Sequence, residues 1–347
     1  MSFDRLPAGS WVLVTGATGL VGSAIVDLLL QRGFRVRGAG RSAVKAAEFK
    51  AHLTKTYGEG VFEFVEVADM TVSGAFDAHL QGVSGILHVA TDTSPETLVD
   101  TDGAIATVAA QTLGLMKSAA RVNSVKSFVL TSSSSTVAAT AVEYGKDIAV
   151  STEIYQEHII ALARSLPADA YPMKPMLGYV STKIHGEQEA WKYWKESKPS
   201  YAFNTVLPFM ILGPVINPTK GHYSSHSSIN EVFEGKADGL GVVYMNPPEW
   251  VVDTRDCAAI HVAALLSTKT NGERLWAAGH PHTLNQYLAT WRKAFPDRKL
   301  LPDFDFPPAP TIDITDREKS TKLLKEFAGK DWYSFEETAL ANVSDAL

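Results

Sequence analysis

The sequence has a single cysteine, Cys257, and no long apolar run. One cysteine can form neither an internal disulfide nor a cysteine-based zinc cluster. We therefore expect a protein of a reducing compartment, the cytoplasm, with Cys257 in the core. A membrane-spanning helix needs roughly 18 continuous apolar residues, and the chain has no such stretch, so we expect no membrane contact. The first residues carry Asp4 and Pro7 among few apolar side chains, and no signal peptide is expected.

Blocks of like charge are also absent. The 347 residues include 32 Lys and Arg against 38 Asp and Glu, a formal net charge of −6 at pH 7. A slightly acidic chain without a basic block is not expected to bind nucleic acid. With 45% hydrophobic residues, a chain of this length can bury a sizeable core, either as two domains or as one large α/β domain with an appended lobe.

Most of the chain alternates between short apolar runs and amphipathic stretches. The apolar runs predict strands at 11–14, 35–39, 61–67, 85–90, 126–131, 201–207, 250–252 and 275–277. The amphipathic stretches predict helices at 23–32, 43–56, 73–80, 101–121, 177–195, 256–266, 316–328 and 334–339. Regular alternation of this kind predicts an α/β fold, a Rossmann-type doubly wound parallel sheet with helices on both faces.

The composition changes near residue 214, which suggests a second, smaller unit. Residues 214–249 are rich in Pro, Gly, Ser, Asn and His, which favours a mobile segment. We expect residues 8–213 and 250–280 to form the dinucleotide-binding domain. Residues 214–249 and 281–347 would form a smaller C-terminal substrate-binding lobe, with 214–249 as a candidate cover over the substrate.

Three glycines follow the first predicted strand and open the first predicted helix. Gly16, Gly19 and Gly22 are spaced GxxGxxG, in the strand–turn–helix context that a dinucleotide fingerprint requires. Glycine permits a tight turn, a close approach of the backbone to a pyrophosphate, and close packing of helix on strand. The alternative is an ordinary strand–helix turn. The context favours a phosphate cradle made of Gly16, Thr18, Gly19, Leu20, Val21 and Gly22.

The segment after the second predicted strand carries cations where NAD-specific enzymes usually place an acid. Arg41 and Lys45 suit a 2′-phosphate, which an acid would repel, so the expected cofactor is NADPH/NADP. Alternatively, both are solvated cations at a helix start. Asp69 follows the third strand and is placed to bond the adenine, although a helix N-cap role is also open. The other expected cofactor contacts are Met70, Ala90, Thr91 and Thr131.

Tyr179 and Lys183 are four residues apart in a predicted helix, which puts a phenol and an ammonium on one face. A nearby ammonium favours phenolate and lowers the pKa of a phenol, so the pair is suited to acid–base catalysis. A surface tyrosine and lysine would show the same spacing. The pair gains meaning only together with other features of an active site.

A run of hydroxyls, Thr131 to Ser135, ends the strand expected at 126–131. Ligands bind at the carboxyl ends of strands in open parallel sheets, and a hydroxyl there can polarise a substrate carbonyl. The alternative is a turn with capping serines. The glycine cradle, the serine run and the Tyr/Lys pair occur in order along a doubly wound pattern, and together they favour an active site.

Four stretches together resemble the extended short-chain dehydrogenases/reductases: TGATGLVG, TSSSS, GYVSTK and VLPFMILGP. The arrangement is similar to the dihydroflavonol reductase-like branch, especially fungal and yeast NADPH-dependent aldehyde and ketone reductases. The resemblance implies that Ser133 is the catalytic serine, Tyr179 the proton donor and Lys183 the ribose-binding lysine. It also implies that Pro208 meets the nicotinamide carboxamide and Arg41 the 2′-phosphate. Val108 stands where many relatives carry an asparagine, which puts a four-residue proton relay in doubt.

The function that this resemblance implies is reduction of a carbonyl, with hydride from the nicotinamide and a proton from Tyr179. Candidates for the pocket wall are Ser135, Phe209, Met210 and Trp250, whose largely apolar character favours an aryl or alkyl ketone, an aldehyde or a β-ketoester. A nucleotide-sugar epimerase or dehydratase would use the same Tyr and Lys, but such relatives usually carry an acid where Arg41 stands. A noncatalytic NADPH sensor is the third reading, and the intact catalytic residues argue against it. The chain is expected as a monomer or a homodimer.

Several other conspicuous residues are expected to have ordinary roles. His222 and His226 lie four apart without a third ligand in view, so we expect no metal site and place them at a substrate entrance. His88 is expected as a satisfied core histidine. Trp191 and Trp194 are expected in the core or at an interface.

Overall fold

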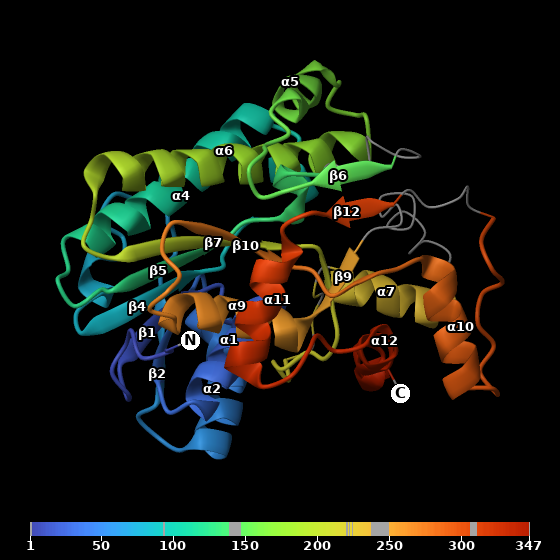
Figure 1. The fold of residues 1–347 in the computed structure, drawn as a ribbon, viewed down its shortest axis with the longest axis horizontal. Coiled ribbons are helices and arrows are strands. Elements are labelled where there is room, and N and C mark those ends of the chain that lie inside the picture. The colour runs from blue at the N-terminus through green and yellow to red at the C-terminus, as the bar shows by residue number, and fades with distance from the viewer. Residues whose placement is uncertain are drawn as a thin grey trace.

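A seven-stranded parallel sheet forms the centre of the protein, whose computed structural model describes residues 2–92, 94–138, 147–219, 221, 223, 225–236, 250–305 and 311–346 (Figure 1). Its order is β10-β7-β5-β4-β1-β2-β3, and every neighbouring pair runs parallel. The strands are β1 (Trp11–Thr15), β2 (Arg35–Gly40), β3 (Phe62–Glu66), β4 (Val83–His88), β5 (Ser127–Thr131), β7 (Ala202–Pro208) and β10 (Glu273–Ala277). The chain winds outward in one direction to β3 and then in the other from β4, which leaves a topological switch point between β1 and β4.

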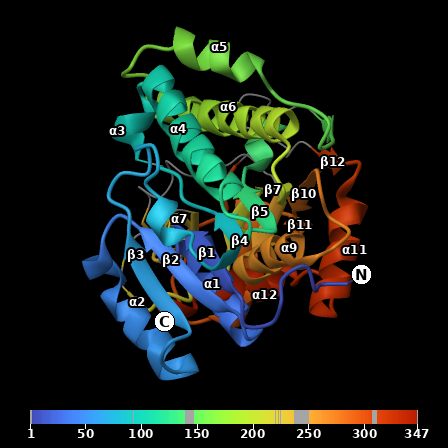
Figure 2. The same cartoon turned by 90° about the vertical axis from the view of Figure 1, so that its left-hand side faces the viewer.

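Helices cover both faces of this sheet (Figures 1 and 2). One layer contains α1 (Leu20–Gln31), α2 (Ala43–Tyr57), α9 (Thr254–Leu266) and α11 (Arg317–Ala328), which share one hydrophobic core. The other contains α4 (Thr101–Ala120) and α6 (Met173–Ser197), with α3 (Pro95–Leu98) and α5 (His158–Ser165) at their ends. The doubly wound Rossmann-type fold predicted from the alternation is therefore confirmed.

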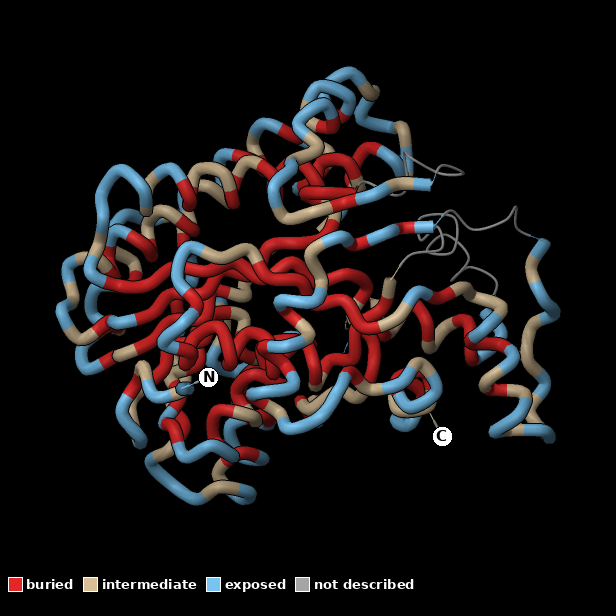
Figure 3. The backbone as a smooth tube through the Cα atoms, in the orientation of Figure 1, coloured by how far each residue is buried: buried red, intermediate tan, exposed pale blue. Residues whose placement is uncertain are grey.

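Burial on both faces explains why the strands read as continuous apolar runs. Val12, Leu13 and Val14 of β1 are completely buried, and so are Phe128 and Val129 of β5. Figure 3 shows the strands buried along the sheet while the exposed positions lie on the outer surfaces of helices and loops. Alternating side chains of one strand thus enter two different cores, as expected for a parallel sheet covered twice.

A smaller lobe adjoins the sheet at the carboxyl ends of its strands. It contains α7 (Ser225–Phe233), α10 (Leu284–Ala294), α12 (Phe335–Asn342) and a three-stranded sheet of β11 (His280–Pro281), β9 (Trp250–Asp253) and β8 (Met210–Leu212). These elements share a core that includes Trp291, Tyr287 and Phe233. A two-stranded sheet pairs β12 (Ile312–Ile314) with β6 (Ile148–Val150).

The packing joins segments across the predicted boundary between the two units, and this division of the chain stays a prediction. α11 was grouped with the lobe, but its Leu323 and Leu324 are buried in the core under the main sheet. Residues 250–252 were grouped with the nucleotide-binding domain, but β9 pairs with β8 and β11 of the smaller sheet. Within 214–249, α7 packs into the lobe through Ile229, Val232 and Phe233, while the C-terminal part of the candidate cover, 237–249, lies outside the described residues.

One predicted helix is wrong. Residues 73–80 form only a single 3-10 turn, Asp77–His79, after Gly74 at φ +78°. The carboxylate of Asp77 accepts hydrogen bonds from Ser118 of α4 and from Arg121, the residue that follows α4. Within the described ranges, no helix is both long and apolar enough to span a bilayer.

Candidate active site

A large cavity of about 1060 Å³ opens at the carboxyl ends of the central strands. Its walls come from the segments that follow β1, β2, β3, β4, β5 and β7, and from the start of α6. Ligands of open α/β sheets bind at this position, beside the topological switch point. The predicted site residues that line it are Gly16, Thr18, Gly19, Leu20, Val21, Gly22, Arg41, Asp69, Met70, Ala90, Thr91, Thr131, Ser133, Ser135, Tyr179, Lys183, Pro208, Phe209 and Met210.

The three glycines leave no room for side chains. Gly16 has φ +64°, and a Cβ there would lie 3.0 Å from the backbone of Ala90. A Cβ on Gly22 would lie only 2.0 Å from the carbonyl oxygen of Gly16. Gly19 precedes α1 as its N-cap without a capping side chain, and the first turn of α1 holds no acid. The first amides of α1 are thus free to bind an anion, which fits the pyrophosphate of a dinucleotide.

The charge near the end of β2 is more mixed than the sequence suggested. Arg41 lines the cavity, whereas exposed Lys45 is not among the described lining residues. Glu66, at the end of β3, accepts a hydrogen bond of 2.8 Å from the backbone of Ala43, the first residue of α2. Asp92 also lines the cavity. Burial raises the pKa of its carboxyl, but hydrogen bonds from Ser94 and the charge of Arg41 outweigh this effect and lower it. Two acids thus share the neighbourhood of Arg41.

Sequence reasoning missed both acids, because each follows a different strand. In the sequence, only their positions could have indicated these acids: Glu66 is the last residue of β3, and Asp92 follows β4 by a few residues. The carboxyl ends of both strands lie at one edge of the sheet. Asp69 lies in the same row and lines the cavity. Its Oδ1 accepts bonds of 2.8 and 2.6 Å from the amide and hydroxyl of Thr71, which hold its pKa below the usual value. It caps this turn rather than a helix, and a contact to adenine stays a prediction.

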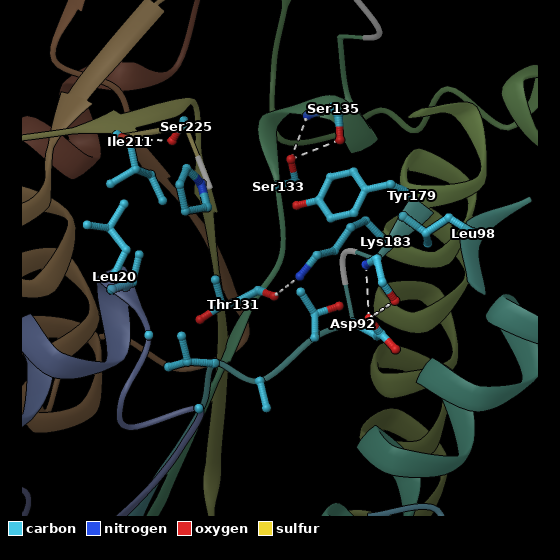
Figure 4. Close-up of a pocket in the computed structure, with 18 of the residues that line it drawn as sticks. Leu20, Asp92, Leu98, Thr131, Ser133, Ser135, Tyr179, Lys183, Ile211 and Ser225 are labelled. Atoms are coloured by element: carbon cyan, nitrogen blue, oxygen red, sulfur yellow. Dashed lines mark hydrogen bonds between the residues drawn. The ribbon is translucent and has the colours of Figure 1, made fainter. Parts of the chain in front are cut away.

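The serine run and the Tyr/Lys pair come together at the deep end of the cavity (Figure 4). Ser133 precedes a 3-10 turn, and its Oγ accepts bonds from the amide (3.2 Å) and hydroxyl (2.8 Å) of Ser135. The Tyr179 hydroxyl points toward the Ser133 side chain (Figure 4). Lys183 Nζ donates to the carbonyl oxygen of Thr131 at 3.0 Å. Strand end and helix face thus place three functional groups on one cavity wall.

Burial, rather than the lysine, dominates the chemistry of the phenol. The pKa of Tyr179 is raised because burial disfavours phenolate, and the nearby Ser133 side chain only partly opposes this. The expected lowering by Lys183 is therefore not found. Burial also lowers the pKa of Lys183 to about 8, against the opposing charge of Glu187. At neutral pH, Tyr179 keeps its proton and Lys183 is mostly charged.

The opposite wall of the cavity is largely apolar. Phe209 and Met210 line it as predicted. Trp250 does not: its Nε1 donates to the carbonyl oxygen of Ile312 at 2.9 Å, and the guanidinium of Arg317 lies 4.8 Å from its ring centre. This side chain joins the lobe to β12 instead. Apolar and aromatic lining residues that sequence reasoning missed include Leu98, Ala138, Tyr171, Pro172, Pro175, Met176, Ile211 and Tyr223, and missed polar ones include Ser94, Gln111, Ser225 and Ser228.

The remaining candidates have structural roles. His88 is buried and bonds to Thr15 Oγ1 at 2.8 Å, as expected for a core histidine. Trp191 and Trp194 pack against Phe203 in the core. His226 is buried beside Asp345 and is not among the residues that line the cavity, and His222 lies outside the described residues. Among the described side chains, no cluster of three metal-ligand residues occurs.

Two further single residues take structural positions. Cys257 is fully buried in α9, as expected. Val108 faces Gly186 of α6, where a Cβ on the glycine would lie 3.0 Å from a valine methyl group. At this point α4 presents a methyl group rather than an amide to the helix of Tyr179.

Comparison with known proteins agrees with this geometry. The model of the NAD dependent epimerase/dehydratase family matches residues 12–277. Aldehyde reductase 2 of Sporidiobolus salmonicolor is 32% identical over 336 residues, 96% of this chain and 95% of the relative. Ketoreductase adrE of Penicillium rubens is 31% identical over 334 residues, 95% of each chain.

Solved structures share the fold over the same length. Yeast methylglyoxal/isovaleraldehyde reductase Gre2, solved with NADPH, has a TM-score of 0.77 at 24% identity and covers 96% of this chain and 97% of its own. Vestitone reductase from alfalfa has a TM-score of 0.73 at 20% identity, with 96% of each chain covered. The chain therefore belongs to the NAD dependent epimerase/dehydratase family, the extended short-chain dehydrogenases/reductases.

Proposed function

We propose that this protein is an NADPH-dependent reductase of aldehydes and ketones. The observation that carries the proposal is the meeting of Ser133, Tyr179 and Lys183 beside an apolar wall, in one cavity with a glycine phosphate cradle. The relatives named aldehyde reductase and ketoreductase support the same reaction class. Arg41 supports NADPH as the cofactor, because a guanidinium can bind a 2′-phosphate through two hydrogen bonds.

Each catalytic side chain has a defined task in this proposal. The bound nicotinamide supplies the hydride. Tyr179 donates a proton to the carbonyl oxygen, a role for which its raised pKa keeps it protonated. Ser133 accepts two bonds from Ser135, which leaves its own proton to donate toward the same oxygen as charge develops there. Lys183, held by Thr131, supplies a buried donor and a positive charge for a cofactor ribose.

The charge of the cavity favours an uncharged substrate over a nucleotide sugar. Arg41 and Lys183 are the cations among the described lining residues, and both belong to the proposed cofactor half. A nucleotide sugar carries a diphosphate that needs cations on the substrate side. The substrate side instead presents Leu98, Pro175, Met176 and Phe209. This wall suits an aryl or alkyl ketone, an aldehyde or a β-ketoester.

A screen of NADPH consumption tests the proposal. Aromatic aldehydes, diketones, β-ketoesters and sugar nucleotides are offered to the wild type, to Tyr179→Phe and to Tyr171→Phe. We expect turnover of the uncharged carbonyls, and loss of ~100-fold or more in kcat for Tyr179→Phe, the low end of a general-acid contribution. Tyr171, an exposed phenol at the cavity edge, is the matched control and should keep its kcat.

Three outcomes would overturn the proposal. Full activity in Tyr179→Phe would remove the proton donor. NADPH binding without oxidation by any carbonyl would favour the noncatalytic sensor. Conversion of sugar nucleotides alone, without net consumption of NADPH, would favour an epimerase or dehydratase.

A further inference from the structure

A buried ion pair lies directly behind the active site. Glu187 follows Lys183 by one turn of α6, and its side chain is 1% exposed. Arg274 of β10 binds both of its oxygens, with Nε–Oε1 2.8 Å and Nη2–Oε2 3.0 Å. Bidentate pairs are strong and directional, yet a buried ion pair is weak evidence for stability because both charges lose their hydration. Its position indicates another role.

Two further hydrogen bonds of this pair reach the turn that carries Ser133. Ser132 Oγ donates to Glu187 Oε2 at 2.7 Å. Arg274 Nη2 donates to Thr136 Oγ1 at 3.0 Å. Ser132 and Thr136 stand on either side of Ser133 in the chain, so the ion pair holds both ends of the turn. The turn is thereby attached to α6, the helix that carries Tyr179.

The same pair also affects Lys183 and contacts residues 154 and 155. The carboxylate of Glu187 raises the pKa of Lys183 against the effect of burial. His88 and His261 near Lys183 are held neutral by burial, so Glu187 is the negative group that compensates the lysine. Arg274 further donates to the carbonyl oxygen of Ile154 at 3.0 Å, and its guanidinium lies 4.0 Å from the ring centre of Tyr155.

We propose that Glu187 and Arg274 are a positioning pair that clamps the 132–136 turn against α6, so that Ser133 and Tyr179 meet one substrate oxygen. This inference rests on the proposed function and adds two residues to its site. Neither residue is assigned contact with substrate or cofactor. Two further donors, Thr205 Oγ1 at 2.7 Å and Trp191 Nε1 at 3.2 Å, bind Glu187 from outside the turn. These two donors allow a comparison between hydrogen bonds to Glu187 that come from the turn and hydrogen bonds that come from elsewhere.

Ser132→Ala and Thr205→Val form a matched test. Each removes one 2.7 Å hydrogen bond to Glu187, but Ser132 belongs to the turn while Thr205 belongs to β7. We expect kcat to fall ~10- to 100-fold in Ser132→Ala, the effect of a displacement of up to about 1 Å, with the Kd for NADPH unchanged. Thr205→Val should lose a similar amount of thermal stability but keep kcat within ~2-fold. Equal losses of kcat that follow the melting temperature would show a merely structural role and overturn the proposal.

Hydrogen–deuterium exchange tests the clamp without turnover. In Glu187→Gln we expect faster exchange of the amides of 132–137, and no change in Thr205→Val. If Glu187→Gln does not fold, the double variant Ser132→Ala/Thr136→Val provides the same measurement with the ion pair intact. Unchanged exchange in the turn would overturn the clamp even if the wild type reduces carbonyls. Faster exchange in a protein that consumes no NADPH would uphold the clamp while the proposed function fails.

The pH profile of kcat separates the electrostatic part of the role. Loss of the carboxylate in Glu187→Gln removes the influence that raises the pKa of Lys183, so the limb of the profile that belongs to this lysine should move to lower pH. A limb that stays in place would show that Glu187 has no electrostatic effect on Lys183. In that case the positioning pair would be limited to the serine turn.

Discussion

Two glycine-to-alanine substitutions should change this protein in opposite directions. Gly22 lies in the first turn of α1, and an added Cβ would stand 2.0 Å from the carbonyl oxygen of Gly16. That oxygen belongs to the backbone and must retreat by more than about 1 Å to reach an ordinary contact distance. Gly114 lies in the middle of α4, where a Cβ would meet only the carbonyl oxygen of Met70 at 3.9 Å. An alanine side chain therefore has no room at position 22 but fits at position 114.

The magnitudes follow from these spaces. Gly114→Ala should stabilise the fold by ~0.5–1 kcal/mol, because alanine loses less backbone entropy in a helix. Gly22→Ala gains the same propensity but suffers overpacking of ~1–3 kcal/mol, so the net change is destabilising. Displacement of the cradle should also raise the Kd for NADPH ~10- to 100-fold. Urea unfolding and a fluorescence titration with NADPH measure the two effects. Wild-type affinity in Gly22→Ala would refute the assignment of this turn as the phosphate cradle.

Three further predictions concern charge. Arg41→Ala should raise the KM for NADPH ~10- to 150-fold, the value of one charge-assisted hydrogen bond, while the KM for NADH stays unchanged; equal weakening of both cofactors would contradict the assignment. Glu66→Gln should lower the KM for NADPH by ~2- to 5-fold, because an exposed acid leaves the N-terminus of α2; a higher KM would show that Glu66 supports the cofactor. Burial lowers the pKa of His88, His261 and His282 to about 3, 4 and 3, so the unfolded chain binds more protons below pH ~6.5. The neutral histidines therefore contribute their full share to the free energy of unfolding above that pH, and this share is lost as the pH falls. In His282→Leu the free energy of unfolding, measured in urea, should fall with decreasing pH by ~1.4 kcal/mol per pH unit less than in the wild type. An unchanged pH dependence would contradict this prediction.

Local sequence patterns were sufficient for the sheet and for the residues at strand ends. The apolar runs located all seven strands of the main sheet, most clearly the inner strands, which are buried on both faces. Gly16 and Gly22 were readable because their spacing reflects a backbone contact within one turn. Tyr179 and Lys183 were readable because helical periodicity fixes which residues share a face. Each of these inferences depends on neighbours in the chain.

The features that escaped prediction depend on contacts between distant segments. Trp250 was expected in the pocket, yet its indole hydrogen-bonds to Ile312, 62 residues further on. The acids near Arg41 come from the ends of β3 and β4, so the local sequence around the arginine gave no sign of them. The pKa of Tyr179 was misjudged because helical spacing shows the neighbouring ammonium but not the burial that outweighs it.

The charge states of the buried groups suit the donation of a proton at neutral pH. Proton donation requires a phenol that is still protonated, and the raised pKa of Tyr179 secures this. Burial disfavours a phenolate here even though the Lys183 ammonium lies 5.8 Å from the centre of the Tyr179 ring. The buried carboxylate of Glu187 is bound by Arg274 and compensates the charge of Lys183. The positive charge is thus retained at the lysine, while the proton is retained at the tyrosine, where a carbonyl oxygen would need it.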